Sequence, residues 1–336
     1  MLVVGPAWIG DMMIAHSLFQ LIQARLDMPL DVLAPPWTHP LLSRMTGVDT
    51  AIAAPFEHGR LHLRRRFEIA RTLAPRRYAR AIVLPGSWKS ALVPFLARVP
   101  RRTGFVGEMR YGLINDARRL DEAAMPMMAQ RYIALLQEPG EPPLSRSEIP
   151  VPRLEASPAS LESALKSLDL NRGQPVLALC PGAEYGPAKQ WPETHFAEVA
   201  RHYIEGGYAV WLMGSRKDLA VAREVDRLCG GRCRVLAGRT TLTEAIDLLS
   251  AAALVVSNDS GLMHIAAALN RPLVAVFGST DPGHTPPLGP RAAIVRRDDL
   301  PCSPCFQREC PLGHLACLRG LDADRVIDAS ARLLAA

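Results

Sequence analysis

The chain has 336 residues, of which 49% are hydrophobic and 21% charged, and its mean hydropathy of +0.06 is near zero. This composition predicts a soluble globular protein of about two domains, each large enough to bury a core. No apolar run approaches the roughly 20 residues of a membrane span. The sequence enters a short strand pattern, MLVVG, without a signal peptide, so the expected compartment is the cytoplasm.

The excess of positive over negative charge lies entirely in the first half of the chain. Residues 1–150 contain 19 Lys and Arg against 13 Asp and Glu, whereas residues 151–336 contain 20 of each sign. Two interpretations stay open: a solvated helix face, or a basic surface for an anionic partner. Nucleic acid is disfavoured as that partner, because no zinc-finger, RNP or helix-turn-helix pattern accompanies the arginines. The arginines form three groups: Arg60, Arg64, Arg65 and Arg66; Arg76, Arg77 and Arg80; Arg98, Arg101 and Arg102.

The first half alternates strand and helix patterns. Apolar runs predict strands at 2–5, 30–35, 50–55 and 79–86, with helices at 11–26 and 61–73. This alternation indicates a parallel sheet with helices on both faces.

Residues 137–159 contain six prolines and no periodicity, which predicts an interdomain linker. A second alternating series follows, and a loop-rich segment separates it from a last helix at 323–336. We therefore expect an α/β protein with two Rossmann-like parallel-sheet domains, 1–150 and 151–320, facing a central cleft, and a C-terminal segment, 321–336, that packs back on the N-terminal domain. The strands of the second series are expected at 175–182, 208–215, 234–238, 254–256 and 273–277, and its helices at 193–205, 217–228, 242–251 and 262–269.

A polar turn, NDSG, joins the strand at 254–256 to the helix at 262–269. At such a junction the unpaired N–H groups and the positive helix end attract anions. Asp259 or Ser260 could serve only as the helix N-cap. Since a cap needs one polar residue, the group of Asn258, Asp259 and Ser260, with Gly261 and then His264 one turn on, instead suggests a site for a diphosphate and a polar sugar.

The turn after the first strand, VGPAWIGD, lacks the G-x-G-x-x-G spacing, which argues against a dinucleotide-dependent dehydrogenase. Asp11 ends this turn. It is either an ordinary N-cap or a carboxylate that faces the cleft and takes a proton from a hydroxyl nucleophile.

Three further strand-end loops are candidates for ligand contact. The loop CPGAEYGPAKQWP can approach phosphate, and its Lys189 supplies a cation beside Asp259. GSRKD places Asp218 where it could accept ribose hydroxyls or only cap its helix, and GRTTL is the third loop.

Eight segments in this order, spread over most of the chain, resemble the ADP-heptose:lipopolysaccharide heptosyltransferases of glycosyltransferase family 9, and above all the branch that adds the second inner-core heptose. The resemblance implies a GT-B fold and an inverting transfer of L-glycero-D-manno-heptose from ADP-heptose to the first heptose of heptosyl-Kdo2-lipid A. It implies no metal or redox cofactor, no nucleic acid, and a peripheral position at the inner face of the inner membrane. The segments are GPAWIGDMM, APPW, LLSRM, VLPGSWKSALVPF, TGFVGEMRYGLIND, CPGAEYGPAKQWP, NDSGLMHIAAALNRPLVA and HTPPL.

Carried over by residue, the resemblance implies a general base at Asp11 and a lysine on donor phosphate and sugar at Lys189. Asp259 matches the aspartate of the donor heptose site, and Asp218 would take the ribose. The remaining donor candidates are the diphosphate cradle Ser260, Gly261 and Leu262, the adenine neighbours Thr240 or Thr241, and also Glu184, Tyr185 and His264; the acceptor candidates are Arg60, Arg64, Lys89 and Arg110.

Two alternatives stay open. One is a GT-B transferase with another acceptor, such as the enzyme that adds the first heptose, which would keep Asp11, Lys189 and Asp259. The other is a sugar-binding protein without catalysis, in which Asp11 is a plain cap.

Four of the seven cysteines lie close together in the sequence, in the spacing C-x2-C-x4-C-x6-C with His314 nearby. They could form a structural metal site or a redox-labile loop. The spacing matches neither a zinc ribbon nor a zinc finger, and a reducing cytoplasm disfavours disulfides. The role of these residues, Cys302, Cys305, Cys310 and Cys317, is therefore open.

Overall fold

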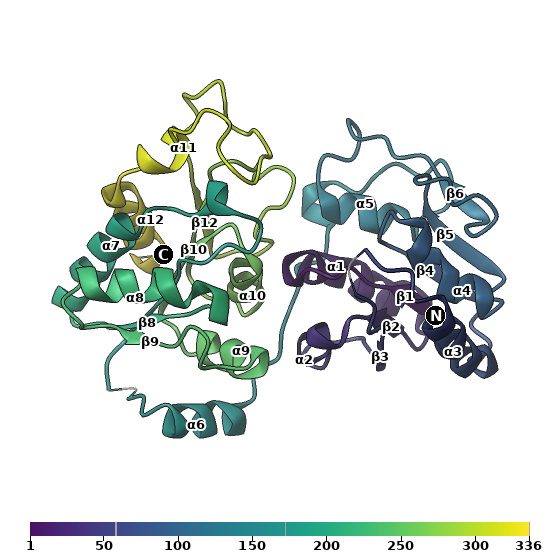
Figure 1. The fold of residues 1–336 in the computed structure, drawn as a ribbon, viewed down its shortest axis with the longest axis horizontal. Helices are drawn as coiled ribbons and strands as arrows, with labels where there is room; N and C mark the ends of the chain where they lie inside the picture. The colour runs from purple at the N-terminus through teal and green to yellow at the C-terminus, as the bar shows by residue number, and fades with distance from the viewer. Residues whose placement is uncertain (58, 172, 336) are drawn as a thin grey trace. The chain divides into compact units, whose positions relative to one another are not determined.

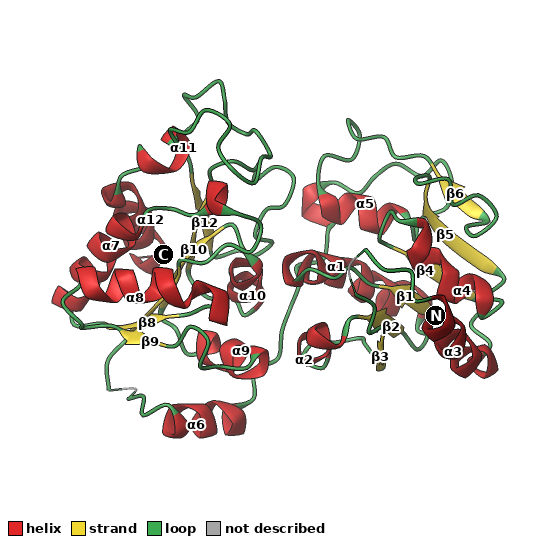
Figure 2. Ribbon diagram, in the orientation of Figure 1, coloured by secondary structure: helices red, strands yellow, loops and turns green. Residues whose placement is uncertain are grey.

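Two six-stranded parallel sheets organise the chain, one in each of two units, Met1–Pro152 and Arg153–Ala336 (Figure 1). The computed structural model describes residues 1–57, 59–171 and 173–335. Figure 2 shows helices and loops surrounding the strands of each sheet. The α/β class and the parallel sheets predicted from the sequence are confirmed. None of the described helices combines the length and apolarity needed to span a bilayer.

The first sheet has the order β3-β2-β1-β4-β5-β6. Its four predicted strands are confirmed, and the first helix begins two residues earlier than expected. β5 and β6 were not predicted, because RRTGF and DAR carry charged residues and no apolar alternation. The strands are β1 (Leu2–Val4), β2 (Asp31–Ala34), β3 (Thr50–Ala53), β4 (Arg80–Val83), β5 (Arg101–Phe105) and β6 (Asp116–Arg118); the helices are α1 (Ile9–Leu26), α2 (His39–Leu42), α3 (Leu63–Leu73), α4 (Leu92–Leu96) and α5 (Met128–Ala134).

The second sheet has the order β12-β11-β10-β7-β8-β9. Its predicted elements are confirmed, whereas β12 lies in the segment expected to be loop-rich and α6 begins inside the expected linker. The strands are β7 (Val176–Cys180), β8 (Ala209–Leu212), β9 (Arg234–Val235), β10 (Leu254–Asn258), β11 (Leu273–Val276) and β12 (Ala292–Val295); the helices are α6 (Pro158–Ser167), α7 (Glu193–Glu205), α8 (Leu219–Leu228), α9 (Leu242–Ser250), α10 (Gly261–Ala268), α11 (Ala316–Arg319) and α12 (Ala323–Ala335).

The last helix is packed within the second unit. α12 contacts α7, β11 and β12, and its Val326 and Ala329 are buried in the core of the second unit. Its apolar face is thus used there, and the expectation that segment 321–336 packs back on the N-terminal domain stays a prediction. Ala336, the last residue of that segment, lies outside the described residues.

Both sheets reverse their strand order at one place, between β1 and β4 in the first and between β7 and β10 in the second. In open parallel sheets, ligands bind at the carboxyl ends of the strands beside such a reversal, because the two connecting loops diverge there. The topology therefore directs attention to Asp11, after β1, and to the loops after β7 and β10.

A buried carboxylate ties β2 to β4. Asp31 is 8% exposed, and its Oδ2 accepts hydrogen bonds from Tyr78 Oη and Arg76 Nη1. Burial alone would raise the pKa of Asp31, but the hydrogen bonds from Tyr78, Arg76 and Thr50, together with the charge of Arg76, outweigh it and lower the pKa. The charged form is therefore the one that the fold stabilises.

We expect Asp31→Asn to destabilise the first unit by about 1–3 kcal/mol at pH 7, because the neutral amide loses the charge that strengthens the hydrogen bonds from Arg76 and Tyr78. A lowered pKa contributes stability that is fully present above the unfolded value of about 3.9 and is lost as the pH falls through the folded value. The deficit of the variant should therefore shrink in acid. Urea midpoints, together with hydrogen exchange at the β1 and β2 amides, measure this.

The matched control is Glu68→Gln, which removes an exposed ion pair with Arg64 and should cost under about 0.5 kcal/mol. Equal losses of stability in the two variants would contradict the stabilising role of the charged Asp31. So would a stability deficit of Asp31→Asn that stays constant down to acid pH.

Candidate functional site

A buried ion pair lies at the carboxyl ends of β7 and β10. Lys189 Nζ is 2.5 Å from Asp259 Oδ2, and the two side chains are 13% and 5% exposed. Thr280, which follows β11, donates to the same oxygen at 2.6 Å. The three strand-end loops thus converge on one carboxylate, which holds the lysine ammonium in place.

Helix α10 begins beside this ion pair. Ser260 occupies the N-cap position, but neither it nor a neighbour makes a side-chain cap hydrogen bond. Its Oγ lies 3.2 Å from Ser257 Oγ instead. Asp259 is engaged by Lys189 and Thr280, so neither side chain caps the helix, although Ser260 occupies the N-cap position as one alternative expected. The N–H groups that begin α10, at Gly261 and Leu262, therefore lack a side-chain cap and suit an anion.

His264 lies one turn into α10 and is 7% exposed. Burial lowers its pKa to about 4, with the charge of Asp259 opposing and that of Lys189 adding to the shift. The imidazole is therefore neutral at pH 7, and the positive charge of the site comes from Lys189 and the helix end.

Asn258 fixes the loop that carries Lys189. Its Oδ1 accepts a hydrogen bond from the backbone N–H of Trp191 at 3.1 Å, and its Nδ2 donates to the Pro181 carbonyl at 2.7 Å. Because Asn258 is fully buried, these bonds are part of the scaffold. Asn258 thus positions the ends of the lysine loop.

Tyr185 joins the lysine loop to the segment that follows β12. Its hydroxyl donates to the Phe306 carbonyl at 2.6 Å. Its ring lies 4.9 Å from Lys189 Nζ and 5.3 Å from the Arg308 guanidinium carbon. Tyr185 thus lies near the ion pair, with the Arg308 guanidinium as a second cation beside its ring, and its contact with the donor stays a prediction.

Arg308 and Thr280 were missed from the sequence. Thr280 could have been found, since it follows a predicted strand of the same sheet. Arg308 lies in a segment without periodicity, and only its contacts, including the Ala188 N–H bonded to its carbonyl at 3.0 Å, show where it is.

Asp218 lies between the ends of β7 and β8. A Cβ added at Gly182 would be 2.2 Å from Asp218 Cγ, and one at Gly214 would be 2.8 Å from Asp218 Cβ, so a side chain at either position would displace that of Asp218. Its Oδ2 accepts from the backbone N–H and the hydroxyl of Ser215, both at 2.8 Å. The carboxylate is at the predicted strand edge and also caps the turn before α8.

The other donor candidates lie nearby in the second unit. Glu184 forms an exposed ion pair with Lys217. Thr241 is the N-cap of α9 and exchanges hydrogen bonds with Glu244, which is a structural role. Thr240 precedes it and is half-buried. An adenine contact by either threonine stays a prediction.

In the first unit, Asp11 lies in the first turn of α1 and is half-buried. Trp8 is the N-cap residue, so the plain-cap alternative for Asp11 is wrong. Burial and the negative charge of Asp11 both raise the pKa of Tyr132 on α5, which shows that the carboxylate lies close to that phenol. A carboxylate beside a helix N-terminus is stabilised in its charged, proton-accepting form.

The basic acceptor candidates differ in what they offer. Arg60 pairs with Glu57 and Arg64 with Glu68, and both arginines are exposed. Lys89 Nζ donates to the Gly59 carbonyl at 3.0 Å.

Arg110 corrects another expectation. It is 3% exposed, and its guanidinium donates to the carbonyls of Phe105 at 2.9 Å and Pro85 at 2.6 Å. Arg110 thus links the end of β5 to the loop after β4 from a buried position. The predicted contact of this guanidinium with an acceptor is therefore wrong.

The four clustered cysteines are free thiols. Hydrogen bonds from backbone N–H groups, that of Leu315 first, lower the pKa of Cys310, whereas burial and the other three thiols raise that of Cys317. Within the described ranges, no group of three or more His, Cys, Asp or Glu is arranged to hold a metal ion.

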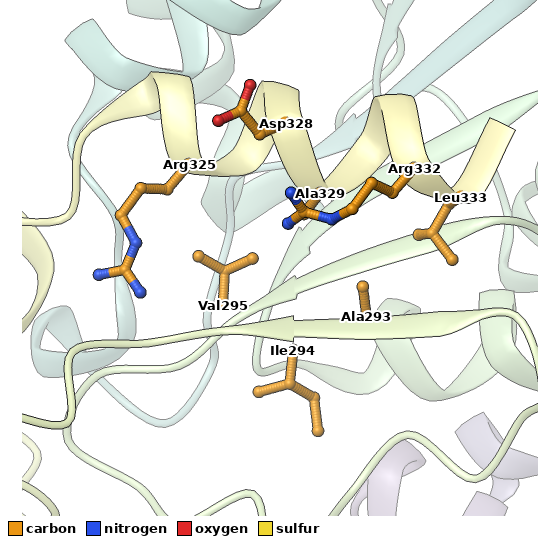
Figure 3. A pocket seen from close by; sticks show the side chains of 8 residues that line it. All are labelled: Ala293, Ile294, Val295, Arg325, Asp328, Ala329, Arg332 and Leu333. Atoms are coloured by element: carbon orange, nitrogen blue, oxygen red, sulfur yellow. The ribbon is translucent and has the colours of Figure 1, made fainter. Parts of the chain in front are cut away.

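A cavity of about 390 Å³ lies away from these loops, between β12 and α12 (Figure 3). Arg325 and Arg332 of α12 line it together with Ile294 and Leu333. It contains no predicted site residue, and we assign it no function.

Comparison with known proteins agrees with this geometry. Residues 66–316 match the model of glycosyltransferase family 9 (heptosyltransferase). The chain is 47% identical to lipopolysaccharide heptosyltransferase 2 of Escherichia coli (strain K12) over 304 residues, which cover 88% of this chain and 87% of the relative. It is 46% identical to lipooligosaccharide heptosyltransferase 2 of Haemophilus influenzae, with 88% of each chain covered.

Among solved structures, E. coli ADP-heptose lps heptosyltransferase II superposes with a TM-score of 0.88 at 42% identity, covering 99% of this chain and 98% of that one. The match confirms the expected GT-B class with two Rossmann-like parallel-sheet units. These relatives favour the second-heptose branch over the first-heptose alternative. The chain therefore belongs to glycosyltransferase family 9, the heptosyltransferases, and is a glycosyltransferase enzyme.

Proposed function

We propose that this protein transfers L-glycero-D-manno-heptose from ADP-heptose to the first heptose of heptosyl-Kdo2-lipid A, with inversion at the anomeric carbon, in the synthesis of the lipopolysaccharide inner core. The observation that carries the proposal is the uncapped N-terminus of α10 beside the buried Lys189–Asp259 pair. It combines a site for a diphosphate with a carboxylate and a hydroxyl suited to a sugar.

The leaving group in this reaction is ADP, which gains negative charge as the bond to the anomeric carbon breaks. Lys189 and the N–H groups at Gly261 and Leu262 would stabilise that charge. Because they are fixed before substrate binds, little reorganisation is needed during the reaction. Asp259 would hold Lys189 in place and contact the heptose hydroxyls, and Asp218 would accept the ribose hydroxyls.

An inverting transfer also needs a base that takes the proton of the attacking hydroxyl. Asp11 suits this role, because it is a half-buried carboxylate in the first turn of α1, after the strand at the reversal of the first sheet. The reaction requires no metal or redox cofactor, since the fixed cations and N–H groups supply the charge stabilisation.

The acceptor chemistry extends the proposal to partners and location. A lipid acceptor with carboxylates and phosphates suits the positive excess of residues 1–150. We propose a peripheral protein at the cytoplasmic, inner face of the inner membrane, with no nucleic-acid partner.

We expect Asp11→Asn to lower kcat by about 10²–10⁴-fold while the affinity for ADP-heptose stays within a factor of about two, because only the base is removed. The measurement is ADP release together with the mass gain of the acceptor. Asp27→Asn is the matched control: Asp27 ends the same helix in a left-handed conformation that asparagine tolerates, so turnover should be unchanged.

The same assay tests the acceptor. Turnover on the mono-heptosylated acceptor and not on Kdo2-lipid A supports the proposal. Turnover on Kdo2-lipid A would shift it to the first-heptose reaction. Donor binding without turnover on either acceptor would favour a sugar-binding protein.

We expect Lys189→Met to weaken the binding of ADP and of ADP-heptose by about tenfold or more, because an ammonium opposite the diphosphate is lost and Asp259 is left buried without its counter-ion. Calorimetric titration measures both ligands. Lys166→Met, which removes an exposed lysine on α6, should leave both affinities unchanged. Similar losses in the two variants would show that overall charge, and not this site, attracts the donor.

A further inference from the structure

Two apolar side chains project from the loop 106–112 at the carboxyl end of β5. Met109 is 88% exposed and Tyr111 is 74% exposed, the highest values among the large hydrophobic side chains described. Displaying such side chains to water is unfavourable, and exposed apolar side chains that gather together mark interaction surfaces.

The loop is firmly held. The buried Arg110, between the two apolar residues, bonds the carbonyls of Phe105 and Pro85. Glu108 Oε2 accepts a hydrogen bond from the backbone N–H of Trp88 at 3.1 Å. The fold thus fixes Met109 and Tyr111 in their exposed positions.

The backbone supports the same conclusion. Glu108 and Met109 have φ values of 42° and 48°, a left-handed conformation that residues other than glycine rarely adopt. Such conformations persist only where the surrounding structure imposes them, often for function.

The start of α3 is tied to the same end of the sheet. Arg66 donates to the Lys89 carbonyl at 2.7 Å, and Lys89 Nζ donates to the Gly59 carbonyl at 3.0 Å. Since Lys89 adjoins Trp88, this network connects α3 with loop 106–112. α3 exposes Leu63 and Phe67, 54% and 51% exposed and one turn apart.

Exposed cationic side chains lie at the start of α3 and just before it. Arg60 and Arg64 are 72% and 94% exposed, and Arg65 is exposed beside them. Apolar side chains that enter the headgroup region, with arginines at the level of the phosphates, are typical of proteins that bind anionic bilayers. The whole charge excess of the chain lies in this half.

We propose that loop 106–112 and the start of α3 form a docking edge for an anionic lipid bilayer. The docking edge consists of Leu63, Phe67, Met109 and Tyr111 with Arg60, Arg64 and Arg65. The inference rests on the proposed function only in that a lipid acceptor gives the docking a purpose. Met109 and Tyr111 insert between headgroups, and the arginines bind lipid phosphates.

The test is sedimentation of the full chain with vesicles of phosphatidylethanolamine, with and without phosphatidylglycerol. We expect Met109→Ser/Tyr111→Ser to lower the partition coefficient on the anionic vesicles by about tenfold or more. Ile294→Ser/Leu334→Ser, a control pair that is 37% exposed at each position in the second unit, should bind as the unmodified protein does. Unchanged binding of the first variant, or an equal loss in the control, would overturn the proposal.

A second measurement does not depend on loss of binding. The fluorescence of Met109→Trp should shift to shorter wavelength with anionic vesicles and stay unchanged with vesicles of phosphatidylethanolamine alone. No shift with either would overturn the proposal. A loss of self-association in Met109→Ser/Tyr111→Ser, seen by analytical ultracentrifugation with no change in vesicle binding, would reassign the edge to a second copy of the chain.

Transfer to a deacylated, water-soluble acceptor separates this inference from the proposed function. We expect Met109→Ser/Tyr111→Ser to keep this activity while losing transfer to vesicle-bound acceptor. Loss of both would mean that the loop contacts the acceptor sugar, which overturns docking. Absence of transfer in the unmodified protein would contradict the proposed function, whereas the result of the vesicle-binding experiment would be unaffected.

Discussion

The second unit depends on one constraint: a lysine and an aspartate are paired where water scarcely reaches them. Removing two charges from water is costly, and the pair persists only if its geometry is fixed and its remaining hydrogen-bonding capacity is met. Thr280 meets part of that need at Asp259, and Asn258 fixes the loop that brings Lys189 to it. Three strand ends are therefore committed to holding one ammonium beside a helix N-terminus.

The same topology serves both units in different ways. Each sheet reverses its strand order once, and in each the helix that follows the strand at the reversal begins without a side-chain cap. In the second unit the open helix end stands beside a lysine, which suits an anion. In the first it carries a carboxylate in its first turn, Asp11, which suits a base. An uncapped helix N-terminus thus stands beside a cation, Lys189, in one unit and beside an anion, Asp11, in the other.

The sequence predicted the elements that a local residue pattern determines. It did not predict the elements and side-chain positions that depend on contacts with distant residues. Apolar runs placed β1, β7 and β10, and the polar residues that follow them are Asp11, Lys189 and Asp259. The strands β5, β6 and β12 were missed, since their partners and not their own residues make them strands. Arg110 was expected to contact the acceptor, because the sequence does not show that its side chain is buried against the Phe105 and Pro85 carbonyls. Arg308 was missed because its segment has no periodicity, and only its contacts with Tyr185 and Ala188 show where it is.

The source of charge at the site also determines how it responds to pH. A histidine beside a diphosphate site could supply a cation that disappears near neutrality. Here burial holds the pKa of His264 at about 4, so that this imidazole is neutral at physiological pH. The charge comes instead from a lysine paired with a carboxylate and from helix N–H groups. His264 therefore adds no pH-dependent charge beside the diphosphate site at physiological pH, and any pH dependence of turnover in that range has another source.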